Sequence, residues 1–247
     1  MRGPAATPGT ASARGQAIMA GLSGRSVDAL LIAGDRDLID HLPLLVDVLP
    51  RRALRLGERG PELFPVVTID YEGAGHLAGR HPRGLGHERV AAVASPAHTV
   101  RIAGFRRAFA AAGLAVPDTA VLLAPEPTPE GGFAAATAAL TADPRVTGVF
   151  ATHDVLGLGV LEAPGALGRS APDDLSVDGH DDNAEVRLSR PALTTVAIPE
   201  RQMARQAVEL LLRAIPRTGP RTDTLHLLRP DLIVRHGTGP ARKRSDS

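Results

Sequence analysis

The chain has 247 residues, of which 43% are hydrophobic, and its net charge at neutral pH is +1. This length and apolar content suit one large domain or two smaller lobes with packed cores, and no apolar run is long enough to span a membrane. The lack of cysteine excludes disulfides and thiolate metal sites, while the near-neutral charge and 2% aromatic content argue against a broad nucleic-acid surface and base-stacking platforms.

Residues 1–15 read M-R-G-P-A-A-T-P-G-T-A-S-A-R-G, a run rich in Gly, Pro, Ala and Thr. Such a composition can bury little apolar surface, so it predicts disorder, with Gln16–Leu22 as the tail of a helix. The run also lacks the apolar core that a secretory signal needs, and we therefore expect a cytoplasmic protein.

Strand and helix patterns alternate through the rest of the chain. Short apolar runs predict strands at 27–33, 53–56, 66–69, 90–94, 146–151, 175–178, 225–228 and 232–234. Apolar residues at helical spacing predict helices at 37–49, 73–83, 100–112, 131–141, 155–167 and 200–215. Gly113 follows the third of these helices, as a C-terminal glycine does. The alternation predicts an α/β fold with a largely parallel sheet.

The stretch from Gly148 to Asn183 combines a strand, a helix and a second strand. A unit of this kind crosses over right-handed and lays its strands parallel, so that both strands end at the same edge of the sheet. The first strand runs into T-H-D (152–154) and the second into G-H-D-D (179–182). Open α/β sheets bind small ligands at such carboxyl ends, which makes these residues candidates for a binding site.

This region contains the runs F-A-T-H-D-V-L-G-L-G-V-L, P-D-D-L-S-V-D-G-H-D-D and P-A-L-T-T-V. Elsewhere the chain contains V-V-T-I-D-Y-E-G-A-G, L-G-H-E-R-V, R-I-A-G-F-R-R-A-F and L-I-V-R-H. In their order and spacing, from about Val27 to His236, these runs resemble the effector-binding core of the lactose-repressor (LacI) family of transcriptional regulators. The periplasmic sugar-binding proteins share that fold.

The resemblance implies an α/β, two-lobed, periplasmic-binding-protein-like fold with mostly parallel sheets and three crossings between the lobes. The implied parts are, in chain order, a segment that is disordered or a partial helix (1–24), a first lobe (25–70 and 197–223), a second lobe (71–196 and 224–237) and a basic disordered tail (238–247). Family members carry a helix-turn-helix headpiece and further first-lobe elements before the point that matches Val27. We therefore expect the first lobe to be truncated at its N-terminus.

Asp181 and Arg101 match positions through which family members hold their effectors. A carboxylate at Asp181 would accept hydrogen bonds from effector hydroxyls, because its two acceptor oxygens suit a sugar diol. A turn or capping aspartate is the alternative, and it suits Asp182 better. Arg101 stands near the start of a predicted helix, where the helix dipole disfavours a cation, so a plain surface role is less natural there.

His153 and Asp70 complete the predicted ligand-binding set. At the position of His153, family members usually have Asn or Gly pointing into the ligand site, and an imidazole can also donate and accept hydrogen bonds; a satisfied loop histidine is the alternative. Asp70 ends a strand at a crossing between lobes, where lining the site or a hinge competes with a simple turn. We expect Asp154 to cap its helix and His87 to interact with carbonyl groups at a helix C-terminus.

Several positions depart from the family pattern. No aromatic residue stands in the loop before Phe133, where relatives often carry a ring that stacks on the effector. Pro82 falls where the family helix continues, and Pro164 predicts a break in its helix after Leu161, since a proline in a helix interior costs about 3 kcal/mol. Asp178 occupies a strand position that is apolar in the family. These departures bear on stability and on the effector, not on ancestry.

The functional expectation follows from these residues and from the resemblance. The His-Asp pairs at the two strand ends are completed by no hydrolase, metalloprotease or phosphate-loop motif, so we expect no enzymatic activity, no metal and no cofactor. The resemblance implies the effector-sensing core of a transcriptional regulator, with a sugar-like or nucleoside-like effector, a homodimeric state and no membrane. Operator DNA would be bound only through a headpiece that this chain lacks. The alternative is a sugar-transport binding protein of the same fold, which the missing signal segment and the L-I-V-R-H ending disfavour.

Overall fold

The computed structural model describes residues 29–33, 53–57, 65–214 and 225–242. The chain divides into two compact units. Unit 1 comprises the residues up to Ile69 together with Pro199–Leu228, and unit 2 comprises Asp70–Ile198 together with the residues from Arg229. Three predicted segments, the disordered start, its helix tail and the helix at 37–49, lie outside the described residues. Within the described ranges, no helix is both long enough and apolar enough to cross a membrane.

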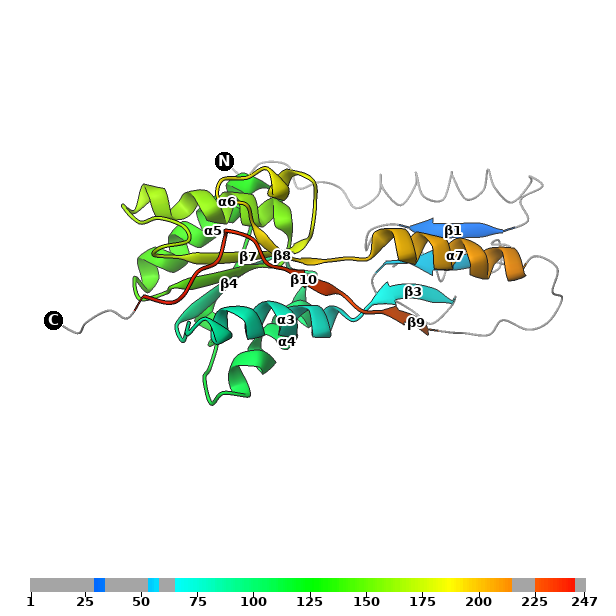
Figure 1. The fold of residues 1–247 in the computed structure, drawn as a ribbon, viewed down its shortest axis with the longest axis horizontal. Helices are drawn as coiled ribbons and strands as arrows, with labels where there is room; N and C mark the ends of the chain where they lie inside the picture. Colours follow the sequence, from blue (N-terminus) through cyan, green and yellow to red (C-terminus); the bar gives the residue numbers. More distant parts are fainter. Residues whose placement is uncertain (1–28, 34–52, 58–64, 215–224, 243–247) are drawn as a thin grey trace, which may run out of the picture. The chain divides into compact units, whose positions relative to one another are not determined.

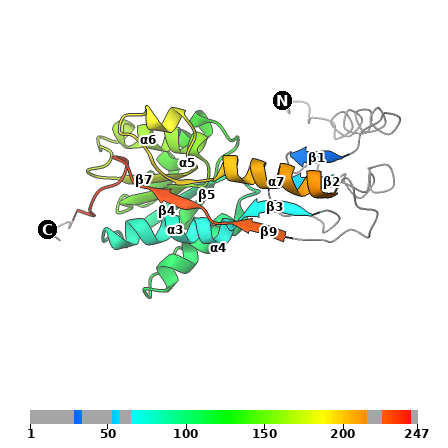
Figure 2. The ribbon, with the colours of Figure 1, turned by 45° about the vertical axis from the view of Figure 1, so that its right-hand side comes forward.

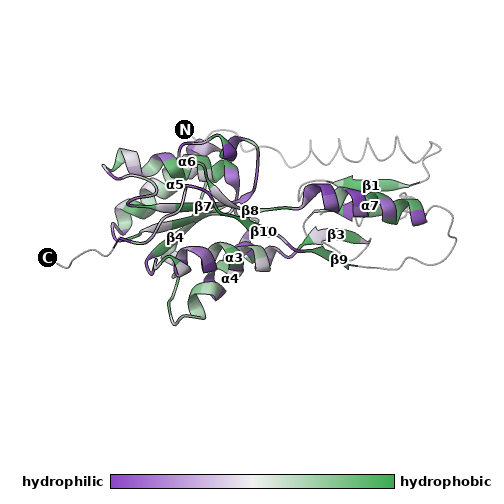
Figure 3. Cartoon of the chain, viewed as in Figure 1, coloured by the Kyte–Doolittle hydropathy of each residue, from purple (hydrophilic) through white to green (hydrophobic). Residues whose placement is uncertain are grey.

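The described part of unit 1 contains a parallel four-stranded sheet and the helix α7 (Figure 1). In spatial order its strands are β1 (Leu30–Ala33), β2 (Ala53–Leu56), β3 (Val66–Ile69) and β9 (Leu225–Leu228). Helix α7 (Glu200–Ala214) contacts the first three of these strands. Its hydrophobic stripe buries Met203 and Ala207 while charged residues cover its other face (Figure 3), which is the pattern of a helix on a sheet.

The prediction that Leu225–Leu228 belongs to the second lobe is wrong. Leu225–Leu228 pairs in parallel with β3, with Val66 opposite Leu225, and belongs to unit 1. Only the next strand, β10 (Asp231–Ile233), lies in unit 2. A short apolar run shows that a strand exists, but it does not show which sheet that strand joins.

Unit 2 is built on a six-stranded sheet in the order β10-β8-β7-β6-β4-β5. Its other strands are β4 (Val90–Ala94), β5 (Val121–Leu123), β6 (Gly148–Ala151), β7 (Ser176–Asp181) and β8 (Thr194–Ala197). All pairings are parallel except that of β10 with β8, which is antiparallel. The strand-helix-strand unit predicted between Gly148 and Asn183 is confirmed, since β6 and β7 pair in parallel with α6 between them.

Helices cover both faces of this sheet (Figures 1 and 2). Helices α3 (Tyr71–Gly84) and α4 (Thr99–Ala110) pack as a pair on one face, and α5 (Pro129–Ala142) and α6 (Asp154–Ala166) as a pair on the other. Because both faces are covered, a central strand such as β4 is buried at all five of its residues. Two short 3-10 helices, η2 (Asp118–Ala120) and η3 (Glu185–Arg187), lie in the connections.

Glycines set how closely α3 and α4 approach. A Cβ atom at Gly75 would lie 1.9 Å from the carbonyl oxygen of Arg101, and one at Gly104 would lie 1.9 Å from that of Glu72. Each glycine therefore accommodates the backbone of the other helix. This close approach holds the first turn of α4, which carries Arg101, directly against α3.

Several predictions about local structure need correction. Pro164 does not end α6 after Leu161, because the helix runs on to Ala166 and the proline falls in its last turn. The edge strand β5 and the strand β8 were not predicted as strands. In the predicted disordered tail, residues 238–242 are ordered against unit 2: Gly239 N donates to Ser176 Oγ, and Ala241 N donates to Leu85 O.

Candidate functional site

The carboxyl ends of three adjacent strands of unit 2 bring polar side chains together. Ser95 follows β4, Thr152 and His153 follow β6, and Asp181 ends β7. These strands are neighbours in the order β7-β6-β4 and run parallel, so their carboxyl ends meet at one edge of the sheet. The first turn of α4 adds Arg101 at the same edge, where its side chain bonds to the carbonyl of Thr152.

Asp181 is held by two histidines. His180 Nδ1 lies 2.7 Å from Asp181 Oδ1, and His153 Nε2 lies 3.2 Å from Oδ2. The side chain of Asp181 is only 10% exposed. Its φ angle is +120°, a backbone conformation that residues other than glycine rarely adopt and that is found mainly at functional positions. The predicted proximity of Asp181 and His153 is therefore present in the structure.

Arg101 is buried and fixed from several sides. Its Nη1 donates to the carbonyl oxygen of Thr152 at 2.7 Å and to Nδ1 of His98 at 3.0 Å. The guanidinium carbon lies 4.8 Å from the ring centroid of Tyr71, a cation–π contact. The Tyr71 ring in turn stacks with that of His180, with 6.0 Å between centroids. Arg101 and Asp181 are thus joined through a common set of rings and belong to one cluster.

Two of the histidines in the cluster are neutral. Burial, followed by the charge of Arg101, lowers the pKa of His98 to about 3. Burial also lowers the pKa of His180, although the hydrogen bond to Asp181 opposes this. Because a guanidinium can only donate, Nδ1 of His98 must accept, and the proton of its neutral ring is on Nε2. His98 therefore presents a fixed N–H donor, and its ring stacks on that of His153.

The carboxyl of Asp181 is held ionised. Burial alone would raise its pKa, but the hydrogen bond from His180 and the nearby positive charge of Arg101 are among the effects that outweigh it, so the pKa lies below its ordinary value. The cluster therefore carries one carboxylate and one guanidinium, with uncharged imidazoles at His98 and His180.

Four polar atoms of this cluster are buried without a hydrogen-bond partner in the described part of the chain: Ser95 Oγ, His153 Nδ1, His180 Nε2 and Asp181 Oδ2. Buried polar atoms are usually satisfied, because leaving one unpaired costs free energy. Their concentration at one edge of the sheet is typical of a place where a polar ligand or water completes the hydrogen bonds.

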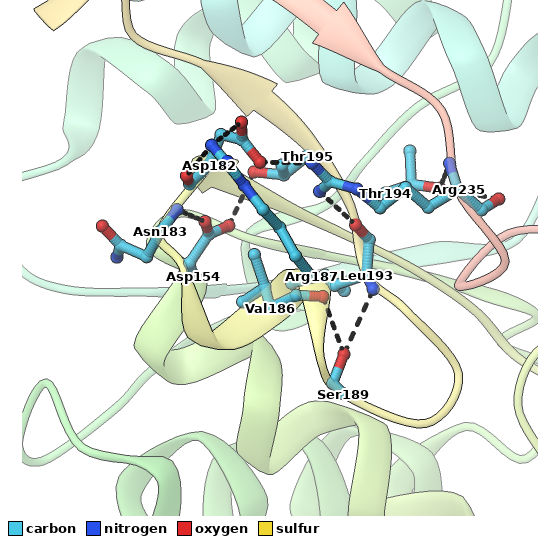
Figure 4. Close-up of polar contacts among 10 residues, drawn as sticks. All are labelled: Asp154, Asp182, Asn183, Val186, Arg187, Ser189, Leu193, Thr194, Thr195 and Arg235. Carbon is cyan, nitrogen blue, oxygen red and sulfur yellow. Dashed lines mark hydrogen bonds and ion pairs between the residues drawn. The ribbon is translucent and has the colours of Figure 1, made fainter.

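Asp154 does not cap its helix as predicted. It is the first residue of α6, the N-cap position is His153, and the Asp154 carboxylate instead accepts from Thr195 Oγ1 at 2.6 Å and from Asn183 N at 2.8 Å (Figure 4). The side chain is fully buried. Burial raises its pKa to about 7, although these two hydrogen bonds oppose the shift. Asp154 therefore ties β8 and the loop after β7 to the start of α6.

Asp182 pins the loop that follows β7. Its φ angle of +64° is left-handed, a conformation that aspartate tolerates in turns. Arg187 Nη2 donates to Oδ2 at 2.7 Å, and Arg235 Nη2 donates to Oδ1 (Figure 4). With both oxygens engaged by arginines, Asp182 has the predicted structural role in the turn.

Asp70 and His87 have structural partners. Asp70 is the N-cap of α3, and its Oδ1 accepts a hydrogen bond from Gly73 N at 2.9 Å. This structural role corresponds to the turn aspartate that was the alternative to lining the ligand site. His87 is buried beyond the end of α3. The hydrogen bonds of its ring go to other groups, not to the carbonyls of that helix as predicted. Its Nε2 donates to Gly239 O, and its Nδ1 accepts from Thr147 Oγ1.

Sequence reasoning missed Tyr71, Ser95 and His98, and it placed His180 among the binding-site candidates without giving it a role of its own. His180 stands inside the quoted G-H-D-D run, and Tyr71 follows the predicted Asp70, so both were within reach of the motif argument. His98 carried no motif signal. In the residues that the structure describes, no group of three or more His, Cys, Asp or Glu side chains is arranged to hold a metal ion.

Known proteins resemble this chain in sequence and in fold. The family model of the periplasmic binding protein-like domain matches residues 80–238. The transcriptional regulator CelR of Thermobifida fusca is 35% identical over 226 residues, which cover 87% of this chain and 64% of CelR. The solved CelR–cellobiose complex is 31% identical with a TM-score of 0.80, over 91% of this chain and 70% of that one. A LacI-family regulator from Sanguibacter keddieii is 32% identical with a TM-score of 0.73, over 90% and 82%.

The fold defines a protein of the periplasmic-binding-protein-like class. Within that class, the chain belongs to the LacI family of transcriptional regulators. The predicted family resemblance and fold class are thereby confirmed, and the matched relatives are regulators rather than enzymes. The chain spans 64% and 65% of the lengths of the first two curated relatives, CelR and a PurR repressor of Vibrio campbellii.

Proposed function

We propose that this chain senses a small, uncharged, hydroxyl-rich effector, a sugar or sugar-like compound, for a LacI-type transcriptional regulator. Asp181, Arg101 and His153 are the proposed contacts, and His98 adds a donor. Asp70 takes part at the start of α3, where its carboxylate fixes the helix turn that carries Tyr71.

The environment of Asp181 is the observation that carries this proposal. The carboxylate is nearly buried yet ionised, and it lies among polar atoms that lack partners in the described residues. A sugar hydroxyl both donates and accepts, so vicinal hydroxyls can donate to Asp181 and accept from imidazole N–H groups. An arrangement of one carboxylate and several donors therefore matches a diol.

The charges of the cluster favour a neutral effector. The charges of Asp181 and Arg101 balance each other, so together they give no net charge that would favour an anionic or a cationic effector. A nucleoside would need a ring to stack on its base, but the loop before Phe133 carries none, and the Tyr71 ring is already in contact with Arg101 and His180. Sugar-like effectors therefore fit better than nucleoside-like ones. The CelR relative, whose structure is a cellobiose complex, makes cellobiose the first compound to test.

The wider role belongs to the same proposal. The family supports control of transcription through operator DNA, with a homodimer in the cytoplasm as the working form and no enzymatic step. Effector binding would then act by favouring one of two conformations of the regulator, because a ligand shifts an equilibrium only through different affinities for the two states.

A thermal-shift screen of the 247-residue chain tests the effector class. The panel holds cellobiose with other neutral mono- and disaccharides, a set of nucleosides, and sugar phosphates. We expect a neutral saccharide to raise the melting temperature, since a ligand that binds only the folded state stabilises it. A response confined to nucleosides or sugar phosphates, or no response to any panel member, would contradict the proposal.

A further inference from the structure

His180 carries the inference, since it contacts Asp181 but is itself fully buried. We propose that His180 is a positioning residue: its Nδ1–H donates to Asp181 Oδ1 and fixes the orientation and ionised state of the carboxylate that contacts the effector. This role rests on the proposed function, because Asp181 is one of the proposed effector contacts.

The backbone at Asp181 makes the bond between these neighbours possible. Consecutive side chains of a regular strand point to opposite faces of the sheet, so adjacent residues cannot normally bond to each other. The φ angle of +120° at Asp181 breaks that alternation at the end of β7 and brings its carboxylate to 2.7 Å from the His180 ring. A strained conformation of this kind persists only where its surroundings fix it.

The hydrogen bond defines the tautomer of His180. An ionised carboxylate can only accept, so Nδ1 must carry the proton. Nε2 is buried and has no partner in the described part of the chain, and burial disfavours a charged ring. His180 is therefore a neutral donor whose orientation is fixed by stacking on Tyr71, with an interplanar angle of 26°.

Other polar groups near Asp181 are placed differently from this donor. His153 faces the second oxygen, but its side chain is 34% exposed and its distance is longer, at 3.2 Å. Arg101 and His98 bond to each other and to Thr152, and the carboxyl of Asp154 adds a like charge when it ionises. His180 is thus the fully buried donor on the carboxylate, while His153 is accessible to a ligand.

Two variants separate the donor from the ring. His180→Asn places an amide N–H near the position of Nδ1–H, whereas His180→Phe keeps an aromatic ring against Tyr71 and removes the donor. The ¹⁵N NMR spectrum of the wild-type chain at neutral pH reports the tautomer. Titration of the ¹³C-labelled Asp carboxyls, with the Asp181 signal assigned by its loss in Asp181→Asn, reports the pKa of that group.

We expect the Nδ1–H tautomer in the wild type and a depressed Asp181 pKa in both the wild type and His180→Asn. In His180→Phe the Asp181 pKa should rise by about one to two units, the size expected when a carboxylate loses a charge-assisted hydrogen bond. An Nε2–H tautomer, an unchanged Asp181 pKa in His180→Phe, or an equal rise in His180→Asn would overturn the role. These readouts need no effector, so a failure of the proposed function would leave them unaffected.

Discussion

Arg101 shows how a single side chain organises the cluster. It bonds the carbonyl of Thr152 and the ring of His98, and it lies over Tyr71. A planar guanidinium can make these two hydrogen bonds and the contact with the Tyr71 ring at the same time, whereas the ammonium group of lysine cannot. The positive charge alone is therefore not sufficient at this position.

Arg101→Lys should lower the free energy of unfolding by about 1–3 kcal/mol, because it loses charged hydrogen bonds and leaves a buried carbonyl unpaired. Arg107→Lys is the matched control on the same helix, since Arg107 is 56% exposed and its ion pair with Glu72 is worth little. Urea unfolding of the two variants makes the comparison. Equal stability in both would show that Arg101 has no such organising role.

At this scale the sequence predicted some residues and could not predict others. Asp181, Arg101 and His153 stand in motifs whose positions follow from the family pattern, and the structure brings them into one cluster. The contact between His180 and Asp181 depends on a single φ angle, which no residue pattern indicates. The place of His98 depends on how the first turn of α4 meets β6, which is set by packing rather than by local sequence.

The helix pair α5–α6 depends on a glycine at a single contact point. A Cβ atom at Gly159 would lie 1.7 Å from the carbonyl oxygen of Pro129, while one at Gly165, further along the same helix, would meet nothing within 4 Å. The close approach of the α5 backbone leaves no room for a side chain at Gly159, whereas there is room for one at Gly165.

Gly159→Ala should therefore destabilise the protein by about 1–3 kcal/mol or more, because α5 and α6 would have to move apart. Gly165→Ala should stabilise it by about 0.5–1 kcal/mol, since alanine is the better helix former. Thermal and urea unfolding of both variants measure the two effects. A shift of the same sign in both would contradict this account of the helix pair.

Strand β7 carries a carboxyl in the core. Asp178 is buried, and its Oδ2 has no partner among the described residues. Burial raises the pKa of this group well above its ordinary value. Between its unfolded pKa of about 3.9 and its folded pKa, the folded state binds more protons than the unfolded state, so stability falls as pH rises.

Asp178→Asn should remove the fall in stability that the buried carboxyl causes as pH rises. The free energy of unfolding of this variant should therefore exceed that of the wild type by an amount that grows from pH 4 to pH 7. The control is Asp173→Asn in the exposed turn before β7, which should follow the wild type at both values. Urea unfolding at the two pH values gives the difference. An advantage that is constant or that shrinks with rising pH would show that Asp178 is not held in its protonated form.

At the scale of elements, periodicity predicted most helices and strands but not their partners. Helices α4 and α7 begin and end within a residue or two of the predicted bounds. Strand β5 was not predicted because it is short and lies at the edge of the sheet, where Leu123 is 60% exposed and the sequence shows no buried apolar run. The assignment of β9 to the wrong lobe has a different cause, since pairing between distant segments is decided by tertiary structure.

For the whole molecule, the family and the net charge lead to a prediction about DNA. The 247-residue chain carries a net charge of +1 and spans 64% of the length of CelR. Without clustered basic excess, its DNA binding should be weak, insensitive to sequence and lost as salt rises. Gel-shift titrations at increasing salt test this, with random DNA as the control for operator-like palindromes. Selective binding that survives salt would place a DNA-reading surface on this chain.

The most direct test of the central claim is calorimetric titration of the neutral saccharide identified by the thermal-shift screen, with wild type, Asp181→Asn and Asp182→Asn. Asp181→Asn should weaken binding about ten- to hundred-fold, because it replaces a charged acceptor of effector hydroxyls. Asp182→Asn should keep near wild-type affinity but melt at a lower temperature, because its ion pairs hold the loop after β7. If Asp182→Asn loses the affinity while Asp181→Asn binds like the wild type, Asp181 is not the effector-binding carboxylate.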